Sequence, residues 1–371
     1  MVEADEVAVI VIDTGTLTTK CGFAGDDAPR SVFRTLVGKP RVPGIMVGMD
    51  LSDAYVGAQA LDKRGLLDTG QPVVGRQIQS WDDIEKVWHH AFYNELRVAS
   101  EEHPVLLSEA PKTPPKVRER ILELMFEDFT VPAYYTAVQA ALGLYGQGKT
   151  IGLVVDSGEG ATHVVPVYEG YPCVHAINTV TVSGGDVTEY LRLLLDKRGY
   201  SFTTHPEIEV VRKIKEQFCE LNPDSREPFS GSVDTTYQLP DSSTILISAE
   251  RIHAPEALFE PSLHNKEGDG LQHRVYQSIM KCDQEIRRDM YNSITLVGGT
   301  TLIKNLSERL RMEVTQLAPV GTRPKVVAAP EREYSVWIGG SILASLATFQ
   351  KMCITKAQYE ESGTKLVHTK C

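Results

Sequence analysis

The chain has 371 residues, a length that favours two or more domains over a single core. Its hydrophobic fraction of 42% and charged fraction of 23% are ordinary for a globular protein, which excludes disordered, collagen-like and coiled-coil chains. A formal net charge of −11 argues against nucleic acid as a ligand, because phosphates require a basic surface.

Cysteine usage and the N-terminus indicate the compartment. The six cysteines are far apart and form no Cys-x-x-Cys pair, which favours reduced thiols. The N-terminus MVEADEVAVI carries acids where a signal peptide carries Lys or Arg, and no apolar run approaches the ~18 residues of a membrane span. We therefore expect a cytosolic protein.

Strands and helices are predicted to alternate along the chain, which favours an α/β fold. The first apolar strand covers residues 7–13 and ends in Asp13. Ser80 then caps a helix that places apolar residues such as Ile84 and Trp88 on one face. A strand over 103–108 and helices over 117–129 and 136–145 follow, with surface loops over 39–50 and 222–232.

The second half repeats the opening pattern. A strand over 151–156 ends in Asp156, turns through Ser-Gly-Glu-Gly, and resumes as a strand over 162–167. Two such hairpins indicate an internal duplication, with one copy in each half. A strand that runs into Gly298-Gly299 precedes helical positions at Leu302, Leu306 and Leu310, and residues 335–346 form a buried helix of small residues.

The two glycine turns have the composition of a polyphosphate site. Free backbone N–H groups, hydroxyl side chains and Lys20 can offset phosphate charge, whereas Asp13 and Asp156 require a hydrated divalent cation between them and the phosphates. For one hairpin alone, an aspartate that merely caps a turn is the simpler interpretation. The paired occurrence, with Lys20 and Gly298-Gly299, favours the phosphate site. The turns match neither a Walker A sequence nor Gly-x-Gly-x-x-Gly.

Hydrolysis of a bound nucleotide would need a water in line with the terminal phosphate. Gln139 and His163 are the polar candidates to position it, although each taken alone is typical of a hydrogen-bonded core residue.

Several long strings closely resemble the actin family, and the similarity covers essentially the whole chain. These strings are FAGDDAPR at 23–30, WDDIEKVWHHAFYNELRVASEEHPVLLSEAP at 81–111, GYSFTT at 199–204, SIMKCD at 278–283 and YSVWIGGSILASLATFQ at 334–350.

The resemblance implies an actin-like ATPase fold of the α/β class, with two duplicated, ribonuclease H-like domains around a nucleotide cleft. It implies four subdomains: an outer large one (1–34, 72–148 and 334–371), an outer small one (35–71, with a flexible loop at 41–50), an inner large one (149–183 and 266–333) and an inner small one (184–265).

The resemblance also implies roles for individual residues. Asp13, Asp156 and Gln139 would organise Mg²⁺ (or Ca²⁺ in purified protein) through waters, and Gln139 and His163 would position the attacking water. The other nucleotide-binding residues would be Thr14, Gly15, Thr16, Leu17, Lys20, Ser157, Gly158, Glu159, Gly160, Gly184, Arg212, Lys215, Glu216, Gly298, Gly299, Thr300, Leu302, Ile303 and Glu333.

The implied function is that of a cytoskeletal actin. Such a protein binds ATP or ADP, polymerises into polar two-stranded filaments, hydrolyses ATP slowly on assembly, and supports motility, cell shape and transport in the cytoplasm. Implied partners are the chain itself, profilin, cofilin, gelsolin-type severing proteins and myosin, with no nucleic acid and no membrane insertion. The partner groove would comprise Tyr145, Ile342, Leu343, Leu346 and Met352. The alternatives are a non-polymerising actin-related subunit of a larger complex, and a chaperone or sugar kinase of the same fold.

Departures from the family pattern concentrate at the expected site. Leu17 stands where the family has a second glycine, Glu159 extends an aspartate by one methylene, and Glu333 replaces a lysine at the base-binding edge. Gly75 occupies the position of a modified histidine. Away from the turns, residues 263–269 are more polar than the family's apolar plug, and Cys353 replaces a tryptophan. We expect altered nucleotide affinity and shorter-lived filaments.

Overall fold

The chain forms two compact units in a computed structural model that describes residues 7–41, 53–227, 229 and 234–371. Unit 1 consists of Met1–Gly148 and Tyr334–Cys371, and unit 2 of Lys149–Glu333. Unit 1 is thus built from two separated stretches, whereas unit 2 is continuous. The finer division into four subdomains stays a prediction. The loop expected at 41–50 lies outside the described residues except for Arg41, and so does part of the loop expected at 222–232.

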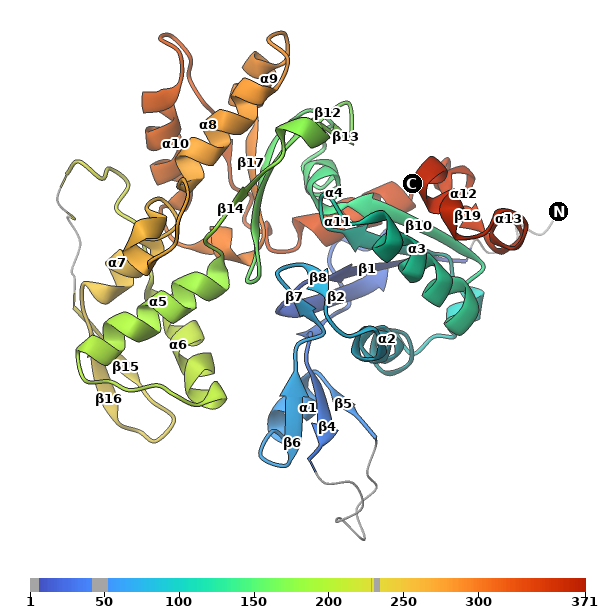
Figure 1. Ribbon diagram of the computed structural model, residues 1–371, viewed down its shortest axis with the longest axis horizontal. Helices are drawn as coiled ribbons and strands as arrows, with labels where there is room; N and C mark the ends of the chain where they lie inside the picture. Colours follow the sequence, from blue (N-terminus) through green and yellow to red (C-terminus); the bar gives the residue numbers. More distant parts are fainter. Residues whose placement is uncertain (1–6, 42–52, 228, 230–233) are drawn as a thin grey trace. The chain divides into compact units, whose positions relative to one another are not determined.

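Unit 1 begins with strands and ends with helices (Figure 1). Its strands are β1 (Ile10–Thr14), β2 (Thr18–Phe23), β3 (Ser31–Arg34), β4 (Val37–Pro40), β5 (Tyr55–Val56), β6 (Leu67–Gly70), β7 (Val73–Val74), β8 (Gln77–Ile78), β9 (Val105–Glu109), β10 (Ala133–Val138) and β19 (Ile354–Thr355). Its helices are α1 (Ala58–Asp62), α2 (Trp81–His89), η1 (His90–Leu96), η2 (Ser100–Glu102), α3 (Pro115–Glu123), η3 (Leu124–Asp128), α4 (Gln139–Tyr145), α11 (Ser335–Ala344), α12 (Phe349–Met352), α13 (Lys356–Ser362), η7 (Thr364–Leu366) and α14 (Val367–Lys370).

Unit 2 has a smaller share of strands. These are β11 (Gly152–Ser157), β12 (Thr162–Tyr168), β13 (Tyr171–Pro172), β14 (Asn178–Val180), β15 (Thr235–Gln238), β16 (Thr244–Ile247), β17 (Ile294–Val297) and β18 (Val326–Val327). Its helices are η4 (Val174–Ala176), α5 (Gly184–Lys197), α6 (His205–Phe218), α7 (Glu250–Glu256), η5 (Pro261–His264), α8 (Leu271–Lys281), α9 (Arg287–Asn292), η6 (Gly299–Leu302) and α10 (Leu306–Leu317).

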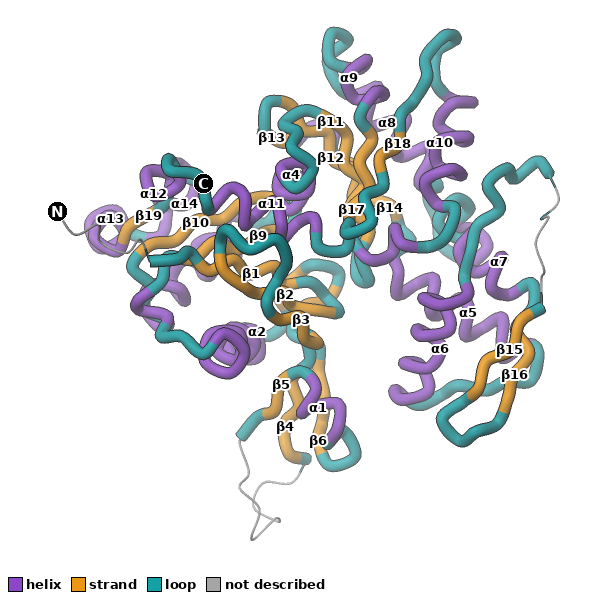
Figure 2. The backbone as a smooth tube through the Cα atoms, turned by 180° about the vertical axis from the view of Figure 1, so that it is seen from behind, coloured by secondary structure: helices purple, strands orange, loops and turns teal. Residues whose placement is uncertain are grey.

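The central sheets of the two units share one arrangement. In unit 1 the order is β19-β10-β9-β1-β2-β3, and in unit 2 it is β13-β12-β11-β17-β18 (Figure 2). In each, an antiparallel hairpin (β1 with β2, β11 with β12) continues into two parallel strands (β9 and β10, β17 and β18). The repeated topology supports the duplication predicted from the two hairpins.

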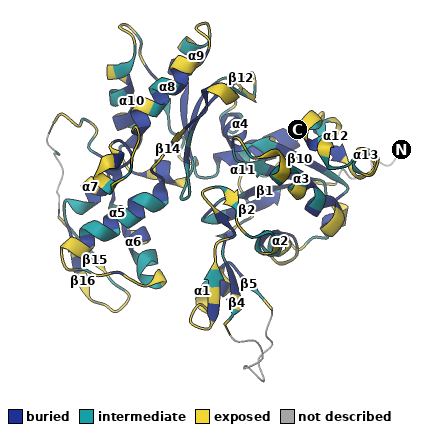
Figure 3. Ribbon diagram, viewed as in Figure 1, coloured by how far each residue is buried: buried dark blue, intermediate teal, exposed yellow. Residues whose placement is uncertain are grey.

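The central sheet of each unit is largely buried and is covered by helices (Figure 3). Every residue of β11 is buried, as expected for a strand covered on both faces. In unit 1 the predicted apolar face of α2 is confirmed: Ile84 and Val87 are fully buried, and the Ser80 hydroxyl caps the helix by accepting from the Asp83 N–H at 3.3 Å.

The helix α11 closes unit 1 from the far end of the chain. Its Trp337 indole donates to the Val11 carbonyl at 3.0 Å, across 326 residues of sequence. It also packs on α4, and a Cβ on Gly339 would lie 1.7 Å from the Leu142 carbonyl oxygen. Only glycine permits this approach, which confirms the packing role expected for the small-residue helix.

Several predicted boundaries were wrong. Residues 136–138 belong to strand β10, because the aromatic and β-branched run before Gln139 pairs with β9, so Gln139 is the first residue of α4. Leu302 lies in the short helix η6 and is 42% exposed, since the left-handed Asn305 separates it from α10. The helix expected over 117–129 is α-helical to Glu123 and then widens into the π-helix η3.

Candidate functional site

Asp13 is the centre of a polar cluster in unit 1. The residue is only 4% exposed, and donors from this unit bond both carboxylate oxygens. Lys20, directly opposite on β2, places its Nζ 3.3 Å from Oδ2, while the Ser108 hydroxyl donates to Oδ1 at 2.5 Å. Gln139 donates to the same Oδ1 through Nε2 at 3.1 Å. The Asp13 carboxylate is thus held in place by three side chains before any ligand is considered.

The sheet explains why these residues meet. Strands β1, β9 and β10 are parallel neighbours, so their carboxyl ends fall on one edge, where ligands of α/β sheets commonly bind. Asp13, Ser108 and Gln139 stand at those three ends. Ser108 was not predicted as a site residue; its signal in the sequence is its position at the end of a predicted apolar strand.

The turn after Asp13 contains a buried hydroxyl that lacks a partner. The Gly15 N–H closes the turn on the Thr18 carbonyl at 3.0 Å, and the Thr14 hydroxyl accepts from the Trp88 indole at 3.1 Å. Thr16 is 8% exposed, and its Oγ1 has no hydrogen-bond partner among the described residues. Because buried hydroxyls are normally satisfied, this atom indicates a place where a polar ligand atom belongs.

The turn of unit 2 has the same construction. Asp156 is 3% exposed. In the register of β11 and β12 it lies opposite His163, as Asp13 lies opposite Lys20 in the register of β1 and β2. The Gly158 N–H closes the turn on the Ala161 carbonyl at 3.0 Å, the same bond that Gly15 makes in unit 1. The two hairpins therefore match in register and in the bond that closes the turn.

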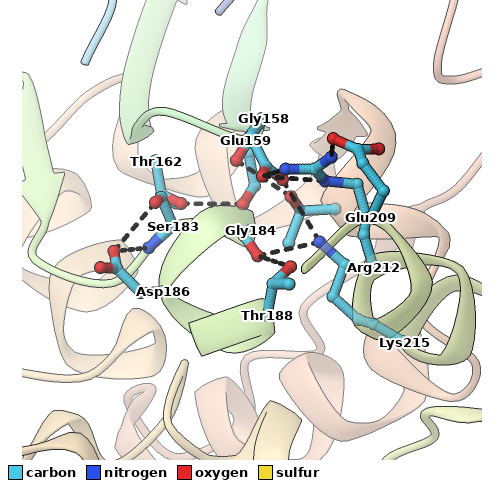
Figure 4. Close-up of polar contacts among 12 residues, drawn as sticks. Gly158, Glu159, Thr162, Ser183, Gly184, Asp186, Thr188, Glu209, Arg212 and Lys215 are labelled. Carbon is cyan, nitrogen blue, oxygen red and sulfur yellow. Dashed lines mark hydrogen bonds and ion pairs between the residues drawn. The ribbon is translucent and has the colours of Figure 1, made fainter. Parts of the chain in front are cut away.

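A group of charged side chains fixes the second turn to α6 (Figure 4). The Glu159 carboxylate accepts from Arg212 at 2.9 and 3.1 Å and from Lys215 Nζ at 3.3 Å, and Arg212 also pairs with Glu209. Burial acts to raise the pKa of Glu159, but the charges of Lys215 and Arg212 outweigh it and lower that pKa. The carboxylate is therefore directed to the cations of α6.

Backbone groups from two other elements also reach this turn. The N–H groups of Gly184 and Gly185, at the start of α5, donate to the carbonyls of Gly158 and Glu159 at 2.9 and 2.8 Å. The Thr300 hydroxyl donates to the Gly158 carbonyl at 3.0 Å. Gly298 has φ +89°, and a Cβ there would lie 2.4 Å from the Ser157 carbonyl oxygen, so the turn requires glycine at this position.

Comparison with known protein families agrees with this construction. The family model for actin matches residues 4–371. The chain belongs to the actin family. Its fold, with mixed α/β sheets in both units, is accordingly the actin-like ATPase fold, and family membership supports nucleotide binding in general.

The two aspartates suit the divalent cation that normally accompanies nucleotide in the actin family. Among the described residues, no group of three or more His, Cys, Asp or Glu side chains could hold a metal ion directly. Within either unit, a cation at the aspartate would have few protein ligands and would keep most of its waters, which is how Mg²⁺ is usually bound beside phosphates. The contact of Asp13, Asp156 and Gln139 with the cation through waters stays a prediction.

The remaining predicted nucleotide residues of unit 2 lie in different settings. Lys215 donates to the Gly184 carbonyl at 2.9 Å, so it belongs with the second turn, whereas Glu216 is exposed on α6. Ile303 is 8% exposed and Gly299 is exposed, with Glu333 the nearest side chain to it at 4.0 Å from an added Cβ. Gly160 is half-buried in the turn itself.

The predicted partner groove is partly exposed. Ile342 and Leu346, at the end of α11 and just after it, are 45% and 50% exposed, while Leu343 is buried and Tyr145 and Met352 are half-buried. Within the described part of the chain, no helix has the length and apolar character of a membrane span.

Proposed function

We propose that this member of the actin family is a filament-forming cytoskeletal ATPase that binds ATP with a divalent cation. The observation that carries the proposal is the pair of matching hairpins, each opened by a buried aspartate at the end of a parallel-sheet strand. Actin family membership over residues 4–371 supports nucleotide binding in general.

Within unit 1, the chain's residues suit the phosphate end of a nucleotide. The Thr16 hydroxyl and the turn's backbone N–H groups would donate to phosphate oxygens, and Lys20 would share its charge between Asp13 and the phosphates. The cation, when bound, offsets phosphate charge and stabilises the charge that develops during phosphoryl transfer.

Within unit 2, α6 suits the sugar and base end. Arg212 and Lys215 are held by Glu159, so their remaining N–H groups are oriented before a ligand arrives, which reduces the entropy lost on binding. The Thr300 hydroxyl bonds the same turn, and Gly299 precedes Thr300 in the chain.

Hydrolysis needs a water held in line with the terminal phosphate, and we assign that task to Gln139 with His163. Gln139 stands beside Asp13 at the first position of α4, and His163 stands opposite Asp156 on β12. Positioning of this kind supplies most of the catalysis in phosphoryl transfer.

For assembly, we propose self-association and the partner classes expected of the family: profilin, cofilin, gelsolin-type severing proteins and myosin. The exposed side chains of Ile342 and Leu346 support a partner surface on α11. The polar segment 263–269 supports short-lived filaments, because Lys266 is bonded to Asp186 at 2.7 Å within its own unit. We propose a cytoplasmic, cytoskeletal location.

A pelleting assay with electron microscopy tests the proposal. The net charge of −11 makes subunits repel at low ionic strength, so salt should promote assembly by screening. We expect two-stranded filaments after addition of Mg·ATP and salt, with phosphate released as they form, and no pellet in low-salt controls. Persistent monomers at high concentration, in a chain shown to bind ATP, would instead support the non-polymerising actin-related subunit.

A further inference from the structure

The side-chain amide of Gln139 is bonded at both ends. Its Oε1 accepts from Arg76 Nη1 at 2.5 Å, and its Nε2 donates to Asp13 Oδ1 at 3.1 Å and to Ser108 Oγ at 3.3 Å. All four residues belong to unit 1. A side chain assigned to the orientation of water is thus itself held by a cation on one side and an anion on the other.

Chemistry fixes which end of the amide faces which partner. A guanidinium group has only donors and a carboxylate has only acceptors, so the carbonyl oxygen must face Arg76 and the NH₂ group must face Asp13. The Ser108 hydroxyl donates its own proton to Asp13, and its oxygen is therefore free to accept from Nε2. Both Nε2 hydrogens are therefore used. If the amide were rotated by 180°, its NH₂ group would face the Arg76 donors and its oxygen would face the Asp13 carboxylate, so both bonds would be lost.

Arg76 makes this contact from an unfavourable backbone position. It is the second residue of the two-residue loop between β7 and β8, where Gly75 has φ +56° and Arg76 has φ +63°. Such type I′ turns favour Gly or Asn at both places, because a larger L-residue is strained there. Arg76 is therefore strained, and its side chain bonds a proposed catalytic group. Strain of this kind at such a site points to a functional reason for the residue.

We propose that Arg76 is a positioning residue that holds Gln139 in a resting orientation and so restrains ATP hydrolysis in the unassembled chain. The proposal rests on the role assigned to Gln139 under the proposed function. To orient a water, the amide must offer a free acceptor and a free donor, but here a cation occupies the acceptor and both donor hydrogens are committed. At least one of these bonds must break before Gln139 can act, and the bond to a charged group is the strongest restraint.

The kinetic test uses R76G and R76N, which both remove the cation and suit the left-handed turn. Single-turnover hydrolysis and ATP affinity are measured on the full chain below its assembly concentration. We expect hydrolysis to rise about tenfold, the scale of one charge-assisted hydrogen bond, with the Kd for ATP unchanged within about twofold. The Q77A variant, at an exposed position of the same hairpin, should behave as wild type, and Q139A should abolish the gain.

A second readout does not depend on hydrolysis. Urea unfolding of R76G, Q139A and the double variant, all with ADP, forms a double-mutant cycle. We expect the shift in unfolding midpoint of the double variant to be smaller than the sum of the single shifts, because either change alone already removes the bond.

Additive midpoint shifts, or hydrolysis that is unchanged or slower in both R76G and R76N, would overturn the proposal. A wild-type chain that neither binds nor hydrolyses ATP would refute the proposed function instead, and the unfolding cycle would then decide alone whether Arg76 restrains Gln139.

Discussion

Replacing Glu159 with Gln removes one charge from the buried group that joins the second turn to α6. The Glu159 side chain is 11% exposed and bonds two cations, Arg212 and Lys215. Breaking a buried ion pair typically costs about 3–5 kcal/mol, because the remaining charge is left uncompensated. Here Arg212 keeps Glu209 and Lys215 keeps the Gly184 carbonyl, so we expect E159Q to lower the free energy of unfolding by about 2 kcal/mol.

The pH dependence of this effect has a definite sign. The pKa of Glu159 is lowered below its ordinary value of 4.5 in the folded chain, so its stabilising charge is fully present above pH 4.5. We expect the difference between wild type and E159Q to be constant from pH 7 to about pH 5. The difference should shrink as the pH falls through the folded-state pKa, where the wild-type carboxyl becomes neutral.

Urea unfolding can assign the loss to unit 2. The three tryptophans, Trp81, Trp88 and Trp337, all lie in unit 1, whereas circular dichroism reports the helices of both units. If the units unfold separately, E159Q should shift the dichroism transition of unit 2 and leave the tryptophan fluorescence transition unchanged. The matched variant E209Q changes a side chain that is 32% exposed and lies three residues before Arg212, so it should lower the free energy of unfolding by only about 0.5 kcal/mol.

The reasoning would be refuted if E159Q were as stable as wild type at pH 7, or if its deficit persisted undiminished at pH 3.5. Either result would mean that the contacts of Glu159 with α6 contribute no net electrostatic stability.

Two further predictions concern backbone packing at Gly298 and the reactivity of the cysteine thiols. G298A should lower the free energy of unfolding by roughly 2–4 kcal/mol, because its Cβ meets the Ser157 carbonyl at a left-handed φ. G299A, whose Cβ would make only an ordinary contact with Glu333 at 4.0 Å, should change that free energy by less than about 0.5 kcal/mol. Urea titrations compare the two variants, and equal effects would contradict the assignment. Thiol labelling at pH 8 should be fastest at Cys173 and Cys371, which are only half-buried. Burial raises the pKa of these two thiols as well, but it raises the pKa of the other four to about 12, so those should react more slowly. Equally rapid labelling of all six in the folded chain would contradict this expectation for the four buried thiols. Those four are Cys21, Cys219, Cys282 and Cys353.

Local patterns were sufficient to locate both hairpins. An apolar run that ends in aspartate before a glycine turn is visible in the chain at Asp13 and Asp156, and the structure confirms both as buried strand ends. Resemblance to the actin family added the fold, which the match over residues 4–371 bears out.

The partners of these residues could not be predicted locally, because long-range pairing selects them. Ser108 reaches Asp13 only because β9 pairs in parallel with β1, 95 residues away in sequence. Glu159 bonds cations 53 and 56 residues further on, a pairing that no local pattern predicts, and its place beside the phosphates stays a prediction. Likewise, no local pattern around Gly75-Arg76 predicts that the Arg76 side chain donates a hydrogen bond to Gln139.

The divided construction of unit 1 sets an order of folding. Unit 2 is a continuous stretch and can complete its core as soon as it has been synthesised, whereas β1 must wait for α11, whose Trp337 bonds Val11. At ordinary rates of translation, unit 2 separates the two pieces of unit 1 by roughly 10–40 s. Throughout that interval the nascent chain carries an uncovered apolar strand, so its folding yield should depend on proteins that shield such strands on and after the ribosome.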